Sequence, residues 1–258
     1  MLGEELVRVH ETAAVVPRFS ERYPGLTAEA GYAGARALHA HRLARGWKPL
    51  GRKIGFTNRT LWERYGVHEP MWGTVYDRTV IEAKQNRATV ELRGLAQPRI
   101  EPEIAFKLKR VPHSSEVAEL LGCIDWMAHS VEIVQCHHPD WKVTIADCTA
   151  DNGLHGRLVV GTPIPMQDPD KLPKLEARLF KGSELKDRGV GANVLGSPLI
   201  SLGYLVDLLK KQPDAEPLRA GEIVTTGVLT DAHPVAPGET WHTEISGLPL
   251  EGLAIAFR

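Results

Sequence analysis

The stretch Arg99-Ile100-Glu101-Pro102-Glu103-Ile104-Ala105-Phe106-Lys107-Leu108 decides how the rest of the chain is interpreted. Read with a period of two, its large apolar side chains share one face, and Glu101 and Glu103 share the other. This alternation predicts a half-buried strand that carries two carboxylates side by side. Pro102 cannot donate a hydrogen bond to a neighbouring strand, so we expect the strand to lie at an edge or to be locally interrupted.

Two adjacent carboxylates repel each other unless a positive charge lies between them. A hard divalent cation such as Mg²⁺ or Ca²⁺ would supply that charge, because it prefers oxygen ligands. Glu132, in the β-like run Val131-Glu132-Ile133, is a candidate for a third ligand. The alternative is the solvated face of an antiparallel sheet, which is commonly charged. From periodicity alone, both interpretations stay open.

The size and charge of the chain exclude several classes of protein. With 258 residues, the chain is long enough for one large domain, or for a domain with a smaller lobe. The 31 basic and 32 acidic residues nearly balance, which gives no support for binding nucleic acid or a membrane surface. We find neither a signal peptide nor a run of the about 18–20 apolar residues that a membrane span needs. Three cysteines do not make a disulfide framework, and we expect a soluble, cytoplasmic protein.

The chain is predicted to change character along its length. Residues 1–75 are expected to form a helical N-terminal region, with a helix that begins after Thr27 as N-cap, is rich in alanine and ends near Gly46. Residues 76–258 are expected to form a strand-rich catalytic domain. Within it, Ser197 followed by Pro198 predicts the start of a helix. We also expect a helix from about residue 117 toward 126. The fold class is therefore α+β, with a mixed and mainly antiparallel sheet.

Lys53 lies between Gly51 and Gly55, where small neighbours allow a ligand to approach the backbone closely. A lysine beside a metal-bound substrate can move a proton or stabilise an enolate. The alternative is an ordinary solvated lysine. In the same way, Asp151 and Asn152 either form a turn before Gly153 or hydrogen-bond Lys53 or a water molecule.

Three other patterns do not support a site. Cys136, His137, His138 and Cys148 lack the paired spacing of a zinc site, so we interpret them as loop residues. The glycines between 189 and 196 do not have the spacing of a nucleotide-binding fingerprint. Ser197 caps a helix and is not part of a nucleophile elbow.

Several motifs together resemble one protein family. They are Gly51-Arg52-Lys53-Ile54-Gly55-Phe56-Thr57, Gln97-Pro98-Arg99-Ile100-Glu101-Pro102-Glu103-Ile104, Val131-Glu132-Ile133-Val134, Ala150-Asp151-Asn152, Val194-Leu195-Gly196-Ser197-Pro198-Leu199, and Thr226-Gly227 followed by Val235-Ala236-Pro237-Gly238. In this order they resemble the 2-keto-4-pentenoate hydratase and 4-oxalocrotonate decarboxylase group of the fumarylacetoacetate hydrolase superfamily.

The resemblance implies a mixed, mainly antiparallel β-roll behind a helical N-terminal region, and Mg²⁺ or Mn²⁺ held by Glu101, Glu103 and Glu132. It implies that Lys53 is catalytic, assisted by Asp77 and Asp151. Asn152 and Thr226 would bind substrate. The chain departs from the family pattern at Gly153-Leu154-His155-Gly156-Arg157 and at Gly196-Ser197-Pro198-Leu199. His155 and Arg157 are therefore candidates to contact a distinctive substrate.

The function that this resemblance implies is hydration of a 2-hydroxy-2,4-dienoate to a 4-hydroxy-2-oxo acid, as in meta-cleavage catabolism of aromatic compounds. A 2-oxo or 2-hydroxy acid can chelate a hard cation, which then stabilises the dienolate. The nearest alternative is decarboxylation of a 2-oxo-3-enedioate, and a C–C bond hydrolase is a further one. A non-catalytic member would lack one of the three glutamates or the lysine, and this chain has all four.

The resemblance also implies a homo-oligomer, which the alanine-rich N-terminal helix could help to form. A complex with another enzyme of the same pathway is a further expectation. We expect a small-molecule 2-oxo or 2-hydroxy acid as the substrate, and neither nucleic acid nor membrane as a partner.

Overall fold

The computed structural model describes residues 1–59, 62–65 and 67–258, and the chain begins with three helices. They are α1 (Leu2–Thr12), α2 (Phe19–Arg22) and α3 (Ala28–Ala44). The hydroxyl of Thr27 accepts a hydrogen bond from the backbone N–H of Ala30, so the predicted N-cap is confirmed. The helix ends at Ala44, just before Gly46, whose positive φ of 78° lets the chain turn away.

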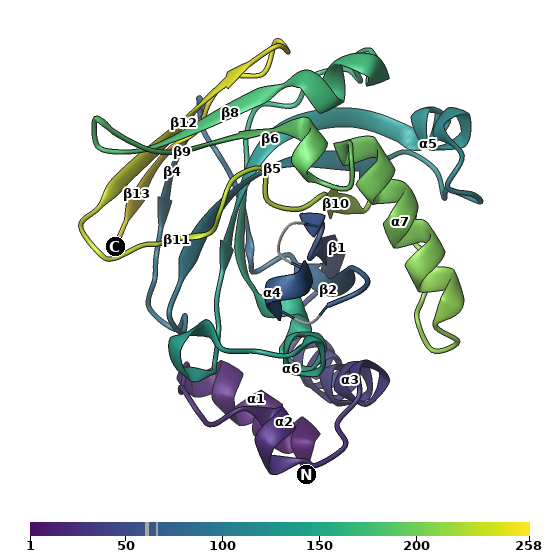
Figure 1. Ribbon diagram of the computed structural model, residues 1–258, viewed down its shortest axis with the longest axis vertical. Coiled ribbons are helices and arrows are strands. Elements are labelled where there is room, and N and C mark those ends of the chain that lie inside the picture. The colour runs from purple at the N-terminus through teal and green to yellow at the C-terminus, as the bar shows by residue number, and fades with distance from the viewer. Residues whose placement is uncertain (60–61, 66) are drawn as a thin grey trace.

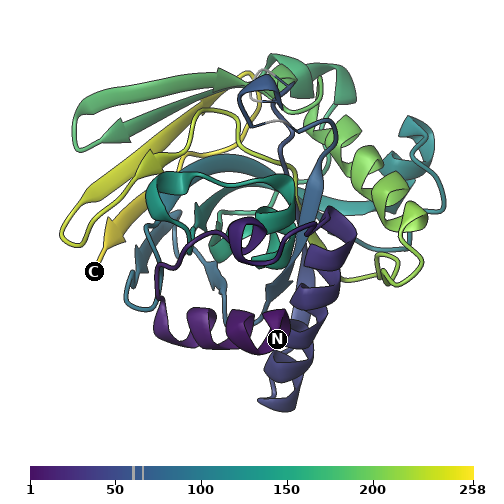
Figure 2. The same ribbon diagram turned by 60° about the horizontal axis from the view of Figure 1, so that its bottom comes forward.

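The small side chains of α3 allow two other helices to approach it closely. A Cβ atom on Gly31 would lie 2.2 Å from the hydroxyl oxygen of Thr149, and one on Gly34 would lie 2.9 Å from a methyl carbon of Leu2. Helix α3 therefore packs against α1 and against α6 (Ile145–Ala150) within this chain. These helices gather with the N-terminus at one end of the molecule (Figure 1), and Figure 2 brings that end forward.

The strands form two sheets, and most of their pairings are antiparallel. The larger sheet has the order β2-β1-β10-β5-β6-β7-β3, and β11 pairs with β5; the smaller one has the order β4-β13-β12-β8-β9. Only β1–β10, β3–β7 and β4–β13 pair in parallel among the described strands, which agrees with the predicted α+β class. The bounds are β1 (Pro49–Gly55), β2 (Met71–Tyr76), β3 (Val80–Glu82), β4 (Arg87–Val90), β5 (Arg99–Leu108), β6 (Ile124–Val134), β7 (His155–Val160), β8 (Glu176–Lys181), β9 (Glu184–Val190), β10 (Ile223–Thr225), β11 (His233–Pro234), β12 (Thr240–Ser246) and β13 (Ala254–Phe257).

The change from helices to strands falls at Pro49, within the region 1–75 that we expected as the N-terminal region. Strands β1 and β2 pair with each other inside the larger sheet, so the region predicted as 1–75 contains two of its strands. At Gly51 the backbone of β1 comes so close to β10 that an added Cβ atom would lie 1.8 Å from the carbonyl oxygen of Ile223. This close pairing ties the N-terminal third of the chain to the centre of the sheet.

The remaining helices cover the sheets or connect their strands. Helix α7 begins as predicted, with the Ser197 hydroxyl accepting from the N–H of Leu199. The helix predicted toward residue 126 is shorter, because β6 already begins at Ile124. The bounds are α4 (Trp62–Tyr65), α5 (Val117–Cys123), α7 (Pro198–Lys211) and the 3₁₀ helices η2 (Pro139–Trp141), η3 (Asn152–Leu154), η4 (Pro169–Lys174) and η5 (Gly191–Asn193).

The segment Gly191–Lys211 concerns our expectation that the chain has no run long and apolar enough to span a membrane. Its length and its mean hydropathy of 1.4 are those of a membrane-spanning helix, although we expected no such run. Leu199, Leu202 and Leu205 of this segment are buried in the main core, together with Ile104 and Phe106 of β5. The apolar composition of α7 is thus used in packing against the sheet.

Leu202→Ala tests this packing. Leu202 is fully buried in the core, so the substitution should lower the free energy of unfolding by about 2–5 kcal/mol. Guanidinium chloride unfolding measures this change. Asp207→Ala, at a partly exposed position of the same helix, should change it by less than about 0.5 kcal/mol. Equal effects of the two substitutions would show that α7 does not contribute to the core as described.

Candidate metal and active site

Strands β5 and β6 bring three carboxylates together. Glu101 and Glu132 are direct partners across this antiparallel pair, and Glu103 follows Glu101 on the same face of β5. One oxygen atom from each of the three lies within 4.8 Å of the others. Glu103 and Glu132 are fully buried, and Glu101 is partly exposed. The predicted ligand set therefore forms one compact cluster.

Lys53 reaches this cluster from β1. Its Nζ atom lies 3.3 Å from Oε2 of Glu132 and donates a hydrogen bond of 2.9 Å to the carbonyl oxygen of Gly153. The side chain is buried, which by itself lowers the pKa of a lysine. The negative charges of Glu132, Glu101 and Glu103 outweigh burial and raise the pKa of Lys53. Lys53 therefore carries a proton at neutral pH.

One lysine does not satisfy three buried carboxylates. Oε2 of Glu103 accepts a hydrogen bond of 3.0 Å from the backbone N–H of Gly227, but Oε1 of Glu103 is buried with no hydrogen-bond partner in the described part of the chain. Burial and the two neighbouring carboxylates raise the pKa of Glu103 well above its usual range. Burial also raises the pKa of Glu101 to about 7, although Lys53 opposes this.

The cluster has the composition of a site for a hard divalent cation. Three converging carboxylates offer only oxygen atoms, which Mg²⁺, Mn²⁺ and Ca²⁺ accept as ligands. The partnerless oxygen of Glu103 and the raised pKa values of Glu101 and Glu103 show that positive charge is lacking there. These residues therefore fit Mg²⁺ or Mn²⁺.

A cavity of about 170 Å³ opens onto Lys53, Glu101 and Glu103. A larger cavity of about 300 Å³ lies elsewhere and includes Arg52, which points to the other face of β1. The chemistry belongs to the smaller cavity, because it contains the carboxylates. Its lining residues are Lys53, Ile54, Gly55, Phe56, Thr57, Asn58, Met71, Arg99, Glu101, Glu103, Val134, Trp141, Val143, Leu154, Gly227, Val228, Asp231 and Ala232.

His155 contacts Glu132, one of the candidate metal ligands, and does not line this cavity. Its Nδ1 atom lies 2.8 Å from Oε1 of Glu132, and its Nε2 atom lies 2.8 Å from the hydroxyl oxygen of Thr79. Together with Lys53, His155 lowers the pKa of Glu132 despite burial. Histidines and other partners behind a metal ligand commonly fix its orientation. The structure thus places His155 behind Glu132, away from the space for substrate.

Three other residues that we expected to bind substrate form hydrogen bonds with the backbone through their side chains. The amide of Asn152 both accepts from the N–H of Thr74 and donates to its carbonyl oxygen. The hydroxyl of Thr226 donates to the carbonyl oxygen of Ile104. Arg157 donates to the carbonyl oxygen of Gly156. None of the three is among the residues that line the 170 Å³ cavity.

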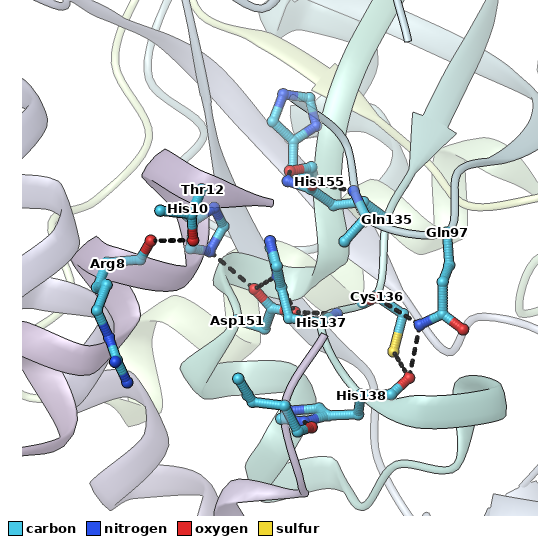
Figure 3. A network of polar contacts seen from close by, with 12 residues as sticks. Arg8, His10, Thr12, Gln97, Gln135, Cys136, His137, His138, Asp151 and His155 are labelled. Carbon is cyan, nitrogen blue, oxygen red and sulfur yellow. Dashed lines mark hydrogen bonds and ion pairs between the residues drawn. The ribbon is translucent and has the colours of Figure 1, made fainter. Parts of the chain in front are cut away.

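The structure does not bring Asp77 and Asp151 to Lys53. Oδ1 of Asp77 accepts from the backbone N–H groups of Lys48 and Arg78, so its carboxylate closes the turn after β2. Asp151 is fully buried between His10 and His137 (Figure 3). Lys53 is thus the only one of the three predicted catalytic residues that the structure places in the cavity.

Cys136, His137, His138 and Cys148 do not form a zinc cluster among the described residues, and Cys148 lies in α6 and not in a loop as we expected. Cys136 and Cys148 are free and buried in an apolar cluster. The ring of His138 packs edge-on against Phe19. Of these four residues, only His137 belongs to a group of side chains that could hold a metal ion. The other members of that group are His10 and Asp151, so it contains neither cysteine.

Sequence reasoning missed several residues of the cavity wall. Met71, Val143 and Leu154 come from three separate segments, and no local pattern marks them as neighbours. Arg99 had a signal that we did not use, because it shares the odd-numbered face of β5 with Glu101. Its guanidinium lies 4.2 Å from the centre of the Trp141 ring.

Comparisons with known proteins show close similarity to two enzyme types. The chain is 32% identical to 2-hydroxyhexa-2,4-dienoate hydratase of Comamonas testosteroni, over 95% of this chain and 93% of that protein. It is 29% identical to 2-keto-4-pentenoate hydratase of Paraburkholderia xenovorans strain LB400, over 95% and 90%. The structure of 4-oxalocrotonate decarboxylase from Pseudomonas putida G7, complexed with magnesium and adipate, superimposes with a TM-score of 0.91 at 26% identity, covering 100% of this chain and 96% of that one. No protein-family model matches the chain.

Glu101→Gln and Glu132→Gln test the metal site. Each substitution removes one negative charge from the ligand set, so stabilisation of the fold by added Mg²⁺ should be lost. For the unaltered chain, Mg²⁺ at 100 times its Kd should raise the free energy of unfolding by about 2.7 kcal/mol. Thermal unfolding with and without Mg²⁺ measures this effect. Glu244→Gln, on an exposed part of β12, is the control and should keep the full response. A full Mg²⁺ response in both site variants would contradict the assignment.

The lowered pKa of His10 predicts that the stability of the protein depends on pH. Burial lowers its pKa from 6.5 to about 4; His137 and Arg42 also lower it, whereas Asp151 raises it. Between pH 6.5 and 4 the unfolded chain therefore binds a proton that the folded chain does not, and His10 makes stability fall as pH falls. The slope is at most about 1.4 kcal/mol per pH unit. His10→Gln removes the titration and should flatten the denaturant-unfolding profile in this range. Identical profiles for the two proteins would show that His10 is not buried as described.

Proposed function

Because this chain belongs to the 2-keto-4-pentenoate hydratase and 4-oxalocrotonate decarboxylase group of the fumarylacetoacetate hydrolase superfamily, we propose that it is a metal-dependent hydratase of a 2-hydroxy-2,4-dienoate. Its product would be a 4-hydroxy-2-oxo acid. The observation that carries this proposal is the cavity lined by Lys53, Glu101 and Glu103, with Glu132 beside them. The reaction is a lyase reaction on a small acid of aromatic meta-cleavage catabolism.

Glu101, Glu103 and Glu132 would hold Mg²⁺ or Mn²⁺. The magnesium complex of the similar decarboxylase supports this choice. When bound, the cation would stabilise negative charge on the C2 oxygen of a 2-oxo or 2-hydroxy acid. Glu101 and Glu103 line the cavity, so a cation held there would orient the carboxylate end of the substrate.

Lys53 would move the proton that the reaction requires. Its Nζ atom carries a proton, faces the cavity and is held from behind by Gly153 and Glu132. Conversion of a 2-hydroxydienoate into its 2-oxo-enoate form removes a proton from the C2 hydroxyl and adds one at C5. Lys53 is placed to deliver the proton to carbon, and the proton that leaves the hydroxyl would restore its charge. Water then adds its hydroxyl at C4 and its proton at C3. Asp77 and Asp151, which we expected to assist, do not line the cavity, so neither would touch the substrate.

The wall beyond the carboxylates supports a substrate with a hydrocarbon chain. Met71, Val143 and Leu154 line the cavity together with the glutamates and present no charge. Burying an apolar chain against such side chains is favourable, whereas burying an unpaired carboxylate is costly. This composition favours a dienoate with one carboxylate, as in the hydratase reaction.

A 2-oxo-3-enedioate decarboxylase is the second candidate. Arg99 lines the same cavity and could bind a second carboxylate. The close superposition with 4-oxalocrotonate decarboxylase also favours it. A C–C bond hydrolase is a weaker alternative, because the three structural and sequence relatives described above are named as hydratases or a decarboxylase.

The proposal includes a homo-oligomer in the cytoplasm and a complex with another enzyme of the same pathway. Family likeness supports it. Helix α3 packs on α1 and α6 of its own chain, and its Ala30, Ala33 and Ala40 are exposed. Light scattering coupled to size-exclusion chromatography measures the number of subunits directly.

Assays with two substrates test the function. With 2-hydroxypenta-2,4-dienoate and Mg²⁺, a hydratase removes the dienol absorbance and releases no CO₂. With 2-oxohex-3-enedioate, a decarboxylase releases CO₂. We expect turnover of the first substrate to exceed that of the second. CO₂ release from the diacid at the higher kcat/KM would establish the second candidate, and no turnover of either would refute both.

Lys53→Ala should lower kcat by about 100-fold or more and leave the Mg²⁺ response of thermal unfolding in place, because the substitution removes the proton donor and keeps all three ligands. Lys107→Ala, at a partly exposed position of β5, is the control and should keep full activity. A Lys53→Ala protein with full activity would remove Lys53 from the mechanism.

A further inference from the structure

The carboxylate of Asp151 is held by two histidines from distant parts of the chain (Figure 3). Oδ1 of Asp151 lies 2.7 Å from Nε2 of His10, on α1, and 2.8 Å from Nδ1 of His137, in the loop after β6. Oδ2 of Asp151 lies 2.9 Å from the same Nδ1 atom. The three side chains are almost completely enclosed, with at most 4% of each exposed.

The neighbouring arginine settles which nitrogen of His10 carries the proton. Nη2 of Arg42 lies 3.1 Å from Nδ1 of His10, and a guanidinium can only donate. Nδ1 of His10 therefore accepts, and Nε2 carries a proton at 2.7 Å from Oδ1 of Asp151, a close polar contact without the alignment of a regular hydrogen bond. His137 donates a hydrogen bond to Asp151 through Nδ1. A metal ion would need a lone pair on Nε2 of His10, which this tautomer lacks, so we interpret the cluster as a polar anchor for Asp151.

The residues that follow Asp151 hold the two charged groups at the centre of the active site. The carbonyl oxygen of Gly153 accepts from Nζ of Lys53 at 2.9 Å. Nδ1 of His155 lies 2.8 Å from Oε1 of Glu132. The five-residue segment 151–155 thus connects the buried carboxylate of Asp151 with both Lys53 and Glu132.

We propose that His10 and His137 are positioning residues for the reaction: they anchor Asp151, and through the segment 151–155 they hold Lys53 at the angle needed for proton transfer. The N-terminal helix α1 is then part of the active-site support, although none of its residues lines the cavity. This inference rests on the proposed role of Lys53. The anchor itself does not depend on which substrate is used.

Asparagine and glutamine separate the two nitrogen positions. The side-chain N–H₂ of glutamine reaches the place of Nε2 of histidine, and that of asparagine reaches the place of Nδ1. His10→Gln and His137→Asn therefore keep the donor to Asp151, whereas His10→Asn and His137→Gln remove it. We expect kcat to fall at least tenfold in His10→Asn and His137→Gln, with little change in KM. In His10→Gln and His137→Asn, kcat should stay within about threefold of the unaltered value. His41→Asn and His41→Gln, at the surface of α3, are matched controls.

Hydrogen exchange of the segment 145–155 gives a second readout that needs no substrate. The N–H groups of Asp151 and Leu154 donate to Asp147 and Asp151 carbonyl oxygens, so they exchange slowly while the segment is anchored. Faster exchange in His10→Asn and His137→Gln alone supports the anchor, even if the protein turns over neither substrate and the proposed function fails. The inference would be overturned if the asparagine and glutamine variants of one histidine lost kcat and exchange protection equally. It would also be overturned if neither quantity changed in any variant.

Discussion

The structure depends on the pairing of Glu101 with Glu132 across β5 and β6. Like charges at directly opposed positions destabilise a sheet, and buried carboxylates are costly unless a cation is near. Lys53 supplies one positive charge at 3.3 Å from Glu132, and Glu103 still keeps a buried oxygen without a partner. The remaining negative charge makes this place suitable for a divalent cation, and the cation in turn determines which substrates the cavity can bind.

The sheet holds this arrangement from two sides. Parallel pairing of β1 with β10 places Lys53 beside Thr225, which pairs in turn with Ala105 of β5, two residues after Glu103, and Gly51 allows the close approach of β1 to β10. On the other side, the segment from Asp151 to His155 supports Lys53 and Glu132 from behind. Because His10 of α1 reaches Asp151 and Arg42 of α3 contacts His10, the helical region would contribute to the site as well as to stability.

The local parts of this account could be predicted from the sequence. Alternation along residues 99–108 indicated the strand and its two glutamates, and the cap signals at Thr27 and Ser197 predicted α3 and α7. The missed parts depend on contacts between distant residues. His10 and Asp151 are separated by 141 positions, and no spacing rule connects them. Asp77 was expected to assist Lys53, yet its carboxylate accepts hydrogen bonds from backbone N–H groups at the turn, and only the three-dimensional structure shows this.

Anomalous diffraction from crystals grown with Mn²⁺ and pyruvate tests the central claim most directly. Pyruvate is a short 2-oxo acid that can chelate the ion but cannot be hydrated as a dienoate is. We predict one strong manganese peak bounded by Glu101, Glu103 and Glu132, with pyruvate in the same cavity and Nζ of Lys53 facing it. A peak between His10, His137 and Asp151 instead, or no ordered manganese at the three glutamates, would contradict this account.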